Sequence, residues 1–276
     1  MNEQLFLIDV NKCTGCGLCI VACKDEHVDS EYLPWTMPQP ESGHFWINVK
    51  PLERGSAPRL KMNFLPTMCQ HCESAPCIPA CPEGAIKTRE DGMVWIDPAV
   101  CKGCGKCEAA CPYDVIYKND ELNISQKCTG CAHRIDEDEQ PRCAEICPHD
   151  AILYNDGPIK PDLNKMEPNT EILHPEFEAS PRVHWKGLPK PWIAGTVTND
   201  AGDEVIANAT VTATGLSHRQ LVTAKTDAFG DFSLTELHDG KGYKIQVTRE
   251  GYAEFDISVT TEGDKDLGAI ALSKNP

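Results

Sequence analysis

The sequence predicts an α+β protein in two parts, a cysteine-rich first part followed by a small antiparallel β-sandwich. Three observations lead to this prediction. All sixteen cysteines lie between Cys13 and Cys147, seven prolines follow between Pro158 and Pro191, and short alternating segments fill the rest. The expected divisions are therefore residues 1–155, an extended connector over 156–191, and a β-sandwich over 192–276.

The first part begins with a short strand-like stretch ending at Ile8 and then contains an internal repeat. The cysteines of Cys13–Cys23 and Cys101–Cys111 share the spacing C-x2-C-x2-C-x3-C, which a chance arrangement would not reproduce. Two more quartets lie between and after them: Cys69, Cys72, Cys77 and Cys81, then Cys128, Cys131, Cys143 and Cys147.

Three of the quartets end in Cys-Pro, where the proline stops a helical turn and a strand follows. The residues from Lys87 to Asp97 read as one such β-hairpin, with Asp-Gly at its turn. The first quartet differs, because Lys24 follows its last cysteine and a polar, Trp-containing insertion then occupies residues 25–68. This insertion is either a docking surface for a partner or a small additional core over the cysteines.

Proline density predicts that the connector forms neither a regular helix nor a central strand. Its apolar residues, Trp185 among them, are expected to pack on a domain surface. Beyond it, apolar and polar residues alternate in short segments between turn signals, which predicts about seven strands in 85 residues. These segments include Ile193–Val197, Ala209–Ala213, Leu221–Ala224, Tyr243–Val247 and Phe255–Val259. No group of His, Cys and carboxylates occurs there, so no chemistry is assigned to this part.

Composition limits the classes of function. The formal net charge of −16 argues against nucleic-acid binding, which needs a basic surface. No run of 18 or more apolar residues occurs, so no membrane anchor is expected. The N-terminus shows no basic stretch or cleavage site, which favours a cytoplasmic location, with export bound to a partner as the alternative.

The cysteine spacing favours metal over disulfides, because neighbours three residues apart rarely bridge each other and disulfide scaffolds are small and secreted. The motif C-x2-C-x2-C-x3-C-Pro is typical of proteins with paired [4Fe–4S] clusters, in which the fourth cysteine binds the neighbouring cluster. Zinc would suit only the last quartet taken by itself. His71, His133 and His149 lie beside ligand cysteines and are expected to be hydrogen-bond donors or solvated residues.

Over residues 1–155 the order of quartets resembles the four-cluster iron–sulfur subunits of the molybdopterin (dimethyl sulfoxide reductase) family. The resemblance implies a tandem ferredoxin-like domain with four [4Fe–4S] clusters, or three if one site differs. It implies four ligand sets: Cys13, Cys16, Cys19 and Cys147; Cys128, Cys131, Cys143 and Cys23; Cys69, Cys72, Cys77 and Cys111; Cys101, Cys104, Cys107 and Cys81. The Cys13 set would lie nearest the molybdenum of a large catalytic partner, which would carry molybdenum bis(molybdopterin guanine dinucleotide) in a heterodimer.

The last part is similar to transthyretin-like or Cna-B-type sandwiches, in the segments Ile193–Val197, Thr226–Phe232 and Gly242–Val247. A four-cluster domain with this addition resembles the transhydroxylase branch of the family. That resemblance implies hydroxyl transfer between phenolic rings, from pyrogallol to phloroglucinol, on the partner subunit, with no catalytic residue in this chain. The alternatives are an electron-transfer subunit of another soluble molybdenum reductase, a stand-alone polyferredoxin, or a subunit that uses its clusters only as structural staples.

Overall fold

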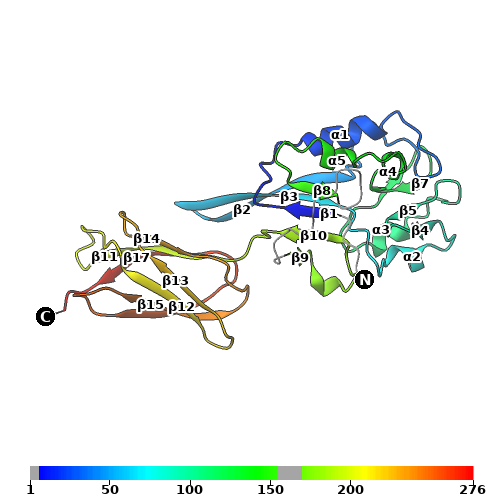
Figure 1. The fold of residues 1–276 in the computed structure, drawn as a ribbon. Coiled ribbons are helices and arrows are strands. Elements are labelled where there is room, and N and C mark those ends of the chain that lie inside the picture. Colours follow the sequence, from blue (N-terminus) through cyan, green and yellow to red (C-terminus); the bar gives the residue numbers. More distant parts are fainter. Residues whose placement is uncertain (1–5, 155–169, 276) are drawn as a thin grey trace. The chain divides into compact units, whose positions relative to one another are not determined.

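The protein is described by a computed structural model that covers residues 6–154 and 170–275 (Figure 1). The chain forms two compact units, and neither is a single stretch of sequence. The first unit consists of residues 1–52 and 63–188, and the second of residues 53–62 and 189–276. The second unit therefore begins close to the predicted boundary but also takes ten residues from the middle of the predicted insertion.

A four-stranded sheet forms the centre of the first unit, in the order β8 (Ile152–Tyr154), β1 (Phe6–Asp9), β10 (Val183–Lys186) and β9 (Glu171–Ile172). The blue β1 and the yellow-green β10 lie side by side in Figure 1 and pair in parallel, while β8 runs antiparallel to β1. All four residues of β1 are buried, because the strand has neighbours on both edges. This sheet joins the two ends of the first unit's sequence.

The prediction of a connector without a central strand was wrong. Residues 156–169 lie outside the described part of the chain, but the rest contains β9, a 3₁₀ turn over Pro175–Phe177 and β10. Strand β10 lies between β1 and β9, and its Trp185 is fully buried. Pro181 and Pro189 flank the strand without entering it, so every residue between them keeps its backbone N–H for pairing.

Short helices carry many of the cysteines. They are α1 (Leu18–His27), α2 (Cys77–Ala80), α3 (Lys106–Ala110), α4 (Ala132–Ile135) and α5 (Arg142–Glu145). Helices α2 and α3 end immediately before the Cys-Pro pairs at Cys81 and Cys111. Helix α1 continues to ten residues, because Lys24 stands where the others have proline.

Two hairpins accompany these helices. The hairpin predicted for Lys87–Asp97 is confirmed by β4 (Ile86–Thr88) and β5 (Val94–Ile96), which pair antiparallel. A second hairpin joins β6 (Tyr117–Asn119) to β7 (Ile124–Gln126).

The insertion forms a long hairpin of β2 (Ile47–Ser56) and β3 (Arg59–Met68). At its base, Trp46, Ile47 and Met68 are buried in the same apolar core as several cysteines. This part of the insertion therefore forms a core over the cysteines, which is one of its two interpretations. The docking interpretation stays a prediction.

The second unit contains two sheets. One has the order β14 (Asp231–Leu234), β11 (Ile193–Asn199) and β17 (Lys265–Leu272). The other has the order β13 (Leu221–Lys225), β12 (Thr210–Gly215), β15 (Gly242–Thr248) and β16 (Phe255–Thr260). An apolar core that includes Val197, Val211 and Ile245 is contributed by both sheets. The prediction of about seven strands is confirmed by β11 to β17 within the described residues, and each of the five named segments overlaps one of them. The prediction of a wholly antiparallel sandwich was wrong, because β11 and β17 pair in parallel.

The second unit includes residues 53–62, which form the end of the β2–β3 hairpin. Two arginines in this segment make hydrogen bonds and ion pairs to the rest of that unit. Arg59 donates to both carboxylate oxygens of Asp266, at 2.8 and 3.0 Å, and to Asp231 and Thr196, at 2.6 Å each. Arg54 pairs with Asp264. A planar guanidinium matches the geometry of a carboxylate, so Arg59 ties two acidic residues to one point.

We predict that Arg59→Met lowers the free energy of unfolding of the second unit by about 1–3 kcal/mol, because Asp266 and Asp231 lose their charged donor. Urea unfolding of the full chain, followed by a probe in the second unit, measures the change. Exposed Lys225 on β13 is the control position, and Lys225→Met should leave the unfolding midpoint unchanged. Equal midpoints for the two variants would contradict the role given to Arg59.

Candidate metal centres

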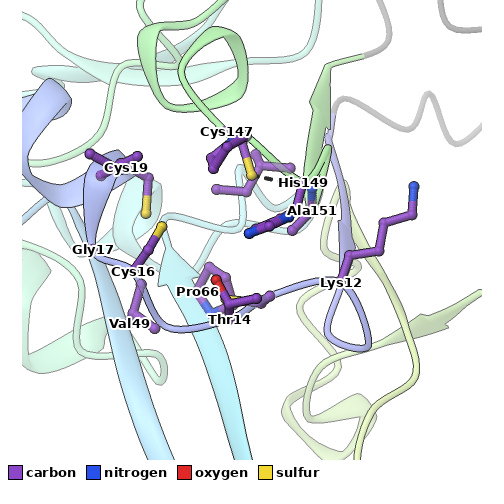
Figure 2. A pocket seen from close by; sticks show the side chains of 14 residues that line it. Lys12, Thr14, Cys16, Gly17, Cys19, Val49, Pro66, Cys147, His149 and Ala151 are labelled. Carbon is purple, nitrogen blue, oxygen red and sulfur yellow. Dashed lines mark hydrogen bonds between the residues drawn. The ribbon is translucent and has the colours of Figure 1, made fainter.

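A first cavity lies between the loop that precedes α1 and the residues that follow α5. Cys13, Cys16, Cys19 and Cys147 line it. Figure 2 shows the sulfur atoms of Cys16, Cys19 and Cys147 turned towards the same space. Burial raises the pKa of Cys19 to about 12, with the neighbouring Cys13 and Cys147 adding to the shift. Such thiols stay protonated near neutral pH unless a bound metal cation stabilises the thiolate, in which case their protons are released to solvent.

A second cavity lies beneath α1 and the base of the β2–β3 hairpin. It is lined by Cys23, Cys128, Cys131 and Cys143, all of them buried. Burial raises the pKa of Cys131 to about 12, and it raises those of Cys23 and Cys143 well above the usual thiol value. The last cysteine of the first quartet thus lies with three cysteines from the fourth.

A third cavity lies beside α2 and β5. It is lined by Cys69, Cys72, Cys77 and Cys111, so it too takes its fourth cysteine from another quartet. Burial raises the pKa of Cys72 and of Cys77 to about 12, with Cys69 adding to both shifts.

The remaining four cysteines are Cys81, Cys101, Cys104 and Cys107. Cys107 is buried in the apolar core that also contains Ile86 and Val94, and Cys81 and Cys101 pack against that core. Cys104 is exposed. Burial raises the pKa of Cys107, while a hydrogen bond from Ser125 opposes the shift.

Backbone amides donate to sulfur in every one of these groups. Sulfur atoms accept from N–H groups 3.2–3.5 Å away in the pairs Ala151–Cys147, Gly130–Cys128, His71–Cys69, Ala85–Cys81 and Ser125–Cys101. Ala85 and Ala151 stand four residues after their cysteines, at the end of a Cys-Pro turn. An amide directed at sulfur favours the thiolate over the thiol, as a metal ligand requires.

The second cavity offers a further test of whether a cluster fits. The indole Nε1 of Trp46 and the hydroxyl of Thr129 are buried at residues that line this cavity, and neither has a hydrogen-bond partner in the described structure. A buried donor without an acceptor is costly. Sulfur atoms of a bound cluster are acceptors, so these residues fit an iron–sulfur cluster.

Comparison with known proteins agrees with this geometry. Two models of the 4Fe-4S dicluster domain match residues 12–85 and 60–156, and the carboxypeptidase regulatory-like domain matches residues 192–273. The small subunit of pyrogallol hydroxytransferase from Pelobacter acidigallici is 35% identical over 99% of this chain and 100% of its own length. The chain belongs to the family of iron–sulfur subunits of molybdenum enzymes.

Other members of this family match a shorter part. A tetrathionate reductase subunit from Salmonella typhimurium is 34% identical over 70% of this chain and 75% of its own length. A component of the anaerobic dimethyl sulfoxide reductase of Escherichia coli is 34% identical over 65% of this chain and 83% of its own length. The family and the dicluster domains establish this chain as an electron-transfer subunit with multiple [4Fe–4S] clusters. Within residues 6–154 and 170–275, no helix is both long and apolar enough to cross a bilayer.

The zinc alternative for the last quartet is not supported. Cys147 lines the first cavity, whereas Cys128, Cys131 and Cys143 line the second. Within the described residues, no three His, Cys, Asp or Glu side chains converge as the ligands of a single ion do. A single zinc ion holds its ligands about 2.3 Å from one centre, while a cubane cluster keeps its four thiolates farther apart.

Two histidines beside the cysteines, His71 and His133, make side-chain hydrogen bonds. Fully buried His71 accepts the N–H of Val94 at Nδ1, and burial holds its pKa well below the usual value, so the ring is neutral. His133 contacts Glu26 at 3.0 Å through Nε2. His149 lies in the lining of the first cavity.

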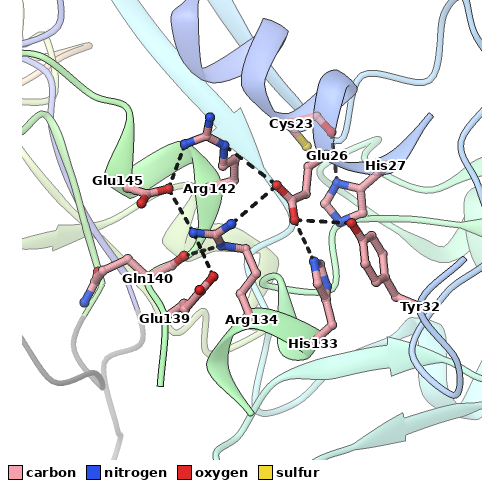
Figure 3. A network of polar contacts seen from close by, with 10 residues as sticks. All are labelled: Cys23, Glu26, His27, Tyr32, His133, Arg134, Glu139, Gln140, Arg142 and Glu145. Carbon is pink, nitrogen blue, oxygen red and sulfur yellow. Dashed lines mark hydrogen bonds and ion pairs between the residues drawn. The ribbon is translucent and has the colours of Figure 1, made fainter. Parts of the chain in front are cut away.

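A network around Glu26 was not predicted from the sequence (Figure 3). Glu26 on α1 pairs with His133 and Arg134 of α4 and with Arg142 of α5, at 3.0, 3.5 and 3.7 Å. Burial alone would raise the pKa of Glu26, but the hydrogen bond from His133 and the charge of Arg134 lower it. The network joins the three helices that carry or adjoin the second cavity's cysteines. No motif marks it, because Glu26 lies more than 100 residues before His133, Arg134 and Arg142.

We predict that Gly103→Ala lowers the iron and acid-labile sulfide content by about one cluster. Gly103 has φ +61°, and an added Cβ would lie 2.4 Å from the backbone oxygen of Asn123, so the loop between Cys101 and Cys104 must move. Gly105 is the matched control, since its φ of +71° carries the same strain but the nearest atom is 3.8 Å away. Equal iron loss in both variants would show that backbone strain, and not the close approach, limits assembly.

Proposed function

We propose that this chain holds four [4Fe–4S] clusters and conducts electrons to and from a large catalytic subunit that transfers hydroxyl groups between phenolic rings. The observation that carries the proposal is the gathering of cysteines from separate quartets around common cavities. The proposed ligand sets are Cys13, Cys16, Cys19 and Cys147; Cys23, Cys128, Cys131 and Cys143; Cys69, Cys72, Cys77 and Cys111; Cys81, Cys101, Cys104 and Cys107.

Exposure of the cysteines supports a relay with two ends. Of the sixteen cysteines, only Cys16 and Cys104 are exposed, and they belong to the first and the fourth ligand sets. The second set is wholly buried, and three members of the third are buried. When bound, a [4Fe–4S] cluster takes up or gives up one electron at a time. The protein keeps the two inner sets away from water and brings the outer two to the surface, where electrons enter and leave.

The surface beside Cys16 suits a protein partner. Leu18 and Val21, on the first turns of α1, are 43% and 65% exposed. Exposed apolar side chains around a redox centre favour burial by another protein. We place the catalytic subunit at this face, which agrees with the resemblance that puts the Cys13 set nearest molybdenum.

The hydroxyl-transfer function rests on the extent of the match. The pyrogallol hydroxytransferase small subunit matches 99% of this chain, which includes the C-terminal unit, whereas the two reductase subunits match 70% and 65%. Hydroxyl transfer between two phenols is redox-neutral overall. The relay would therefore set the oxidation state of the partner's molybdenum bis(molybdopterin guanine dinucleotide) rather than supply electrons at each turnover.

A reductase subunit is the second candidate. It is favoured by the similarity of the cysteine-rich part to subunits of tetrathionate and dimethyl sulfoxide reductases. The identity of the large subunit and its substrate separates the two candidates. A stand-alone polyferredoxin would be recovered without molybdenum or a second chain.

We predict that native purification yields a complex of this chain with a larger chain that contains molybdenum. Iron and sulfide should correspond to four clusters per small chain, and the complex should convert pyrogallol to phloroglucinol. Iron near three clusters would contradict the four ligand sets. Recovery of this chain as a monomer without molybdenum would contradict the proposal that it conducts electrons to and from a catalytic subunit.

The docking face gives a separate prediction. Val21→Glu should weaken binding to the catalytic subunit at least tenfold, because it places a charge in the centre of a desolvated surface. Leu221→Glu is the matched control, since Leu221 is 69% exposed on β13 of the second unit. Titration of the purified small chain against the large chain measures both dissociation constants. Unchanged binding by the Val21 variant, with its iron content intact, would place the partner elsewhere.

A further inference from the structure

Three lysines stand directly before a cysteine, and one of them is buried. Lys12 precedes Cys13 and Lys106 precedes Cys107, and both lysines are exposed. Lys127 precedes Cys128 and is only 2% exposed. Burying an ammonium group is costly unless other charges or hydrogen bonds compensate, so Lys127 requires an explanation that the other two do not.

The contacts of Lys127 supply hydrogen bonds but no negative charge. Its Nζ donates to the backbone carbonyl of Val94 on β5 and, at 2.9 Å, to the carbonyl of Cys128. No carboxylate within the described ranges forms an ion pair with it. An ammonium group has three donors, and two carbonyls leave both its charge and one donor without a match.

The position of Lys127 identifies what matches the charge. Lys127 lines the third cavity together with Cys69, Cys72, Cys77 and Cys111. The carbonyl that it binds belongs to Cys128, whose side chain lines the second cavity. Lys127 therefore lines the cavity of one largely buried cysteine set and donates a hydrogen bond to a cysteine of another.

The electrostatic effect of Lys127 reaches the sulfur atoms. Burial and the neighbouring Cys69 raise the pKa of Cys77, and the charge of Lys127 opposes that shift. It likewise opposes the burial that raises the pKa of Cys128. A charge that favours a thiolate over a thiol also favours added negative charge on a cluster which that thiolate binds.

We propose that Lys127 is a buried counter-charge that stabilises the reduced state of the cluster bound by Cys69, Cys72, Cys77 and Cys111. The proposal rests on the ligand sets of the proposed function. With four thiolates, a [4Fe–4S]²⁺ core carries a net charge of about −2, and one added electron takes it to about −3. Because Lys127 meets this cavity in a water-poor interior, it lowers the energy of that electron and holds it in an inner site of the relay.

A structural role alone is the alternative explanation. Lys127 also links β5 to the loop that carries Cys128, and it could serve only as this link. The two roles differ in their dependence on charge. Lys127→Arg keeps the charge, Lys127→Gln keeps an amide donor without the charge, and Lys127→Met removes both. Lys106→Met is the control, because it removes an exposed lysine that also directly precedes a ligand cysteine.

The test is a redox titration of the purified complex with dithionite, followed by electron paramagnetic resonance, with iron and sulfide counted in the same samples. Lys127→Gln and Lys127→Met should reduce the reduced-to-oxidised ratio of one cluster at least tenfold at a fixed potential. For a one-electron couple this is about 59 mV towards lower potential. The ratio in Lys127→Arg should lie closer to that of the unmodified protein than the ratios in Lys127→Gln and Lys127→Met do. The ratio in Lys106→Met should equal that of the unmodified protein. The affected signal should be the one that Cys77→Ser alters.

The counter-charge role would be overturned if Lys127→Gln assembles four clusters and the reduced-to-oxidised ratio of each stays within twofold of the unmodified protein. A shift confined to a signal that Cys77→Ser does not alter would also overturn it. If Lys127→Met loses iron while Lys127→Gln retains it, the reduced-to-oxidised ratio in Lys127→Gln alone tests the counter-charge role. Iron near three clusters in the unmodified complex would instead overturn the ligand sets, so the two failures are distinguishable.

Discussion

The fold of the first unit depends on the exchange of cysteines between quartets. Cys23 lies with Cys128, Cys131 and Cys143, while Cys147 lies with Cys13, Cys16 and Cys19. Residues more than 100 positions apart must therefore meet before either cavity exists. The antiparallel pairing of β1 with β8, which lies just after Cys147, brings these two ends of the sequence together. Without this exchange, helices of four or five residues would have little to hold them in place.

The cysteine motifs predicted the loops and turns around the cysteines, because those features are local, whereas the pairing of quartets was implied by the family resemblance. Glycine spacing and Cys-Pro ends specify loops and short turns, and the β4–β5 hairpin followed from an Asp-Gly turn. The connector was mispredicted because proline prevents strand pairing only at its own position. The four proline-free residues of β10, which include Trp185, were enough to form an interior strand. The parallel pairing of β11 with β17 was also missed, since alternation predicts a strand but not its neighbour.

The residues that surround the cysteines were less predictable than the cysteines themselves. Nothing in the sequence distinguishes Lys127 from Lys106, because burial is decided by the hairpin that packs over one and leaves the other in water. Trp46 read equally well as a docking residue or a core residue. The Glu26 network depends on three helices meeting, which is a property of the tertiary structure. Such surroundings set hydrogen bonding and charge at the clusters, and so they set potentials.

The most direct test of the exchanged ligand sets is a crystal structure of the complex with anomalous data collected at the iron edge. We predict four iron clusters in the small chain, with Cys147 bound to the same cluster as Cys13 and Cys23 bound to the same cluster as Cys143. Clusters bound within single quartets, such as Cys13 and Cys23 on one cluster, would contradict it. So would a zinc signal at Cys128, Cys131 and Cys143.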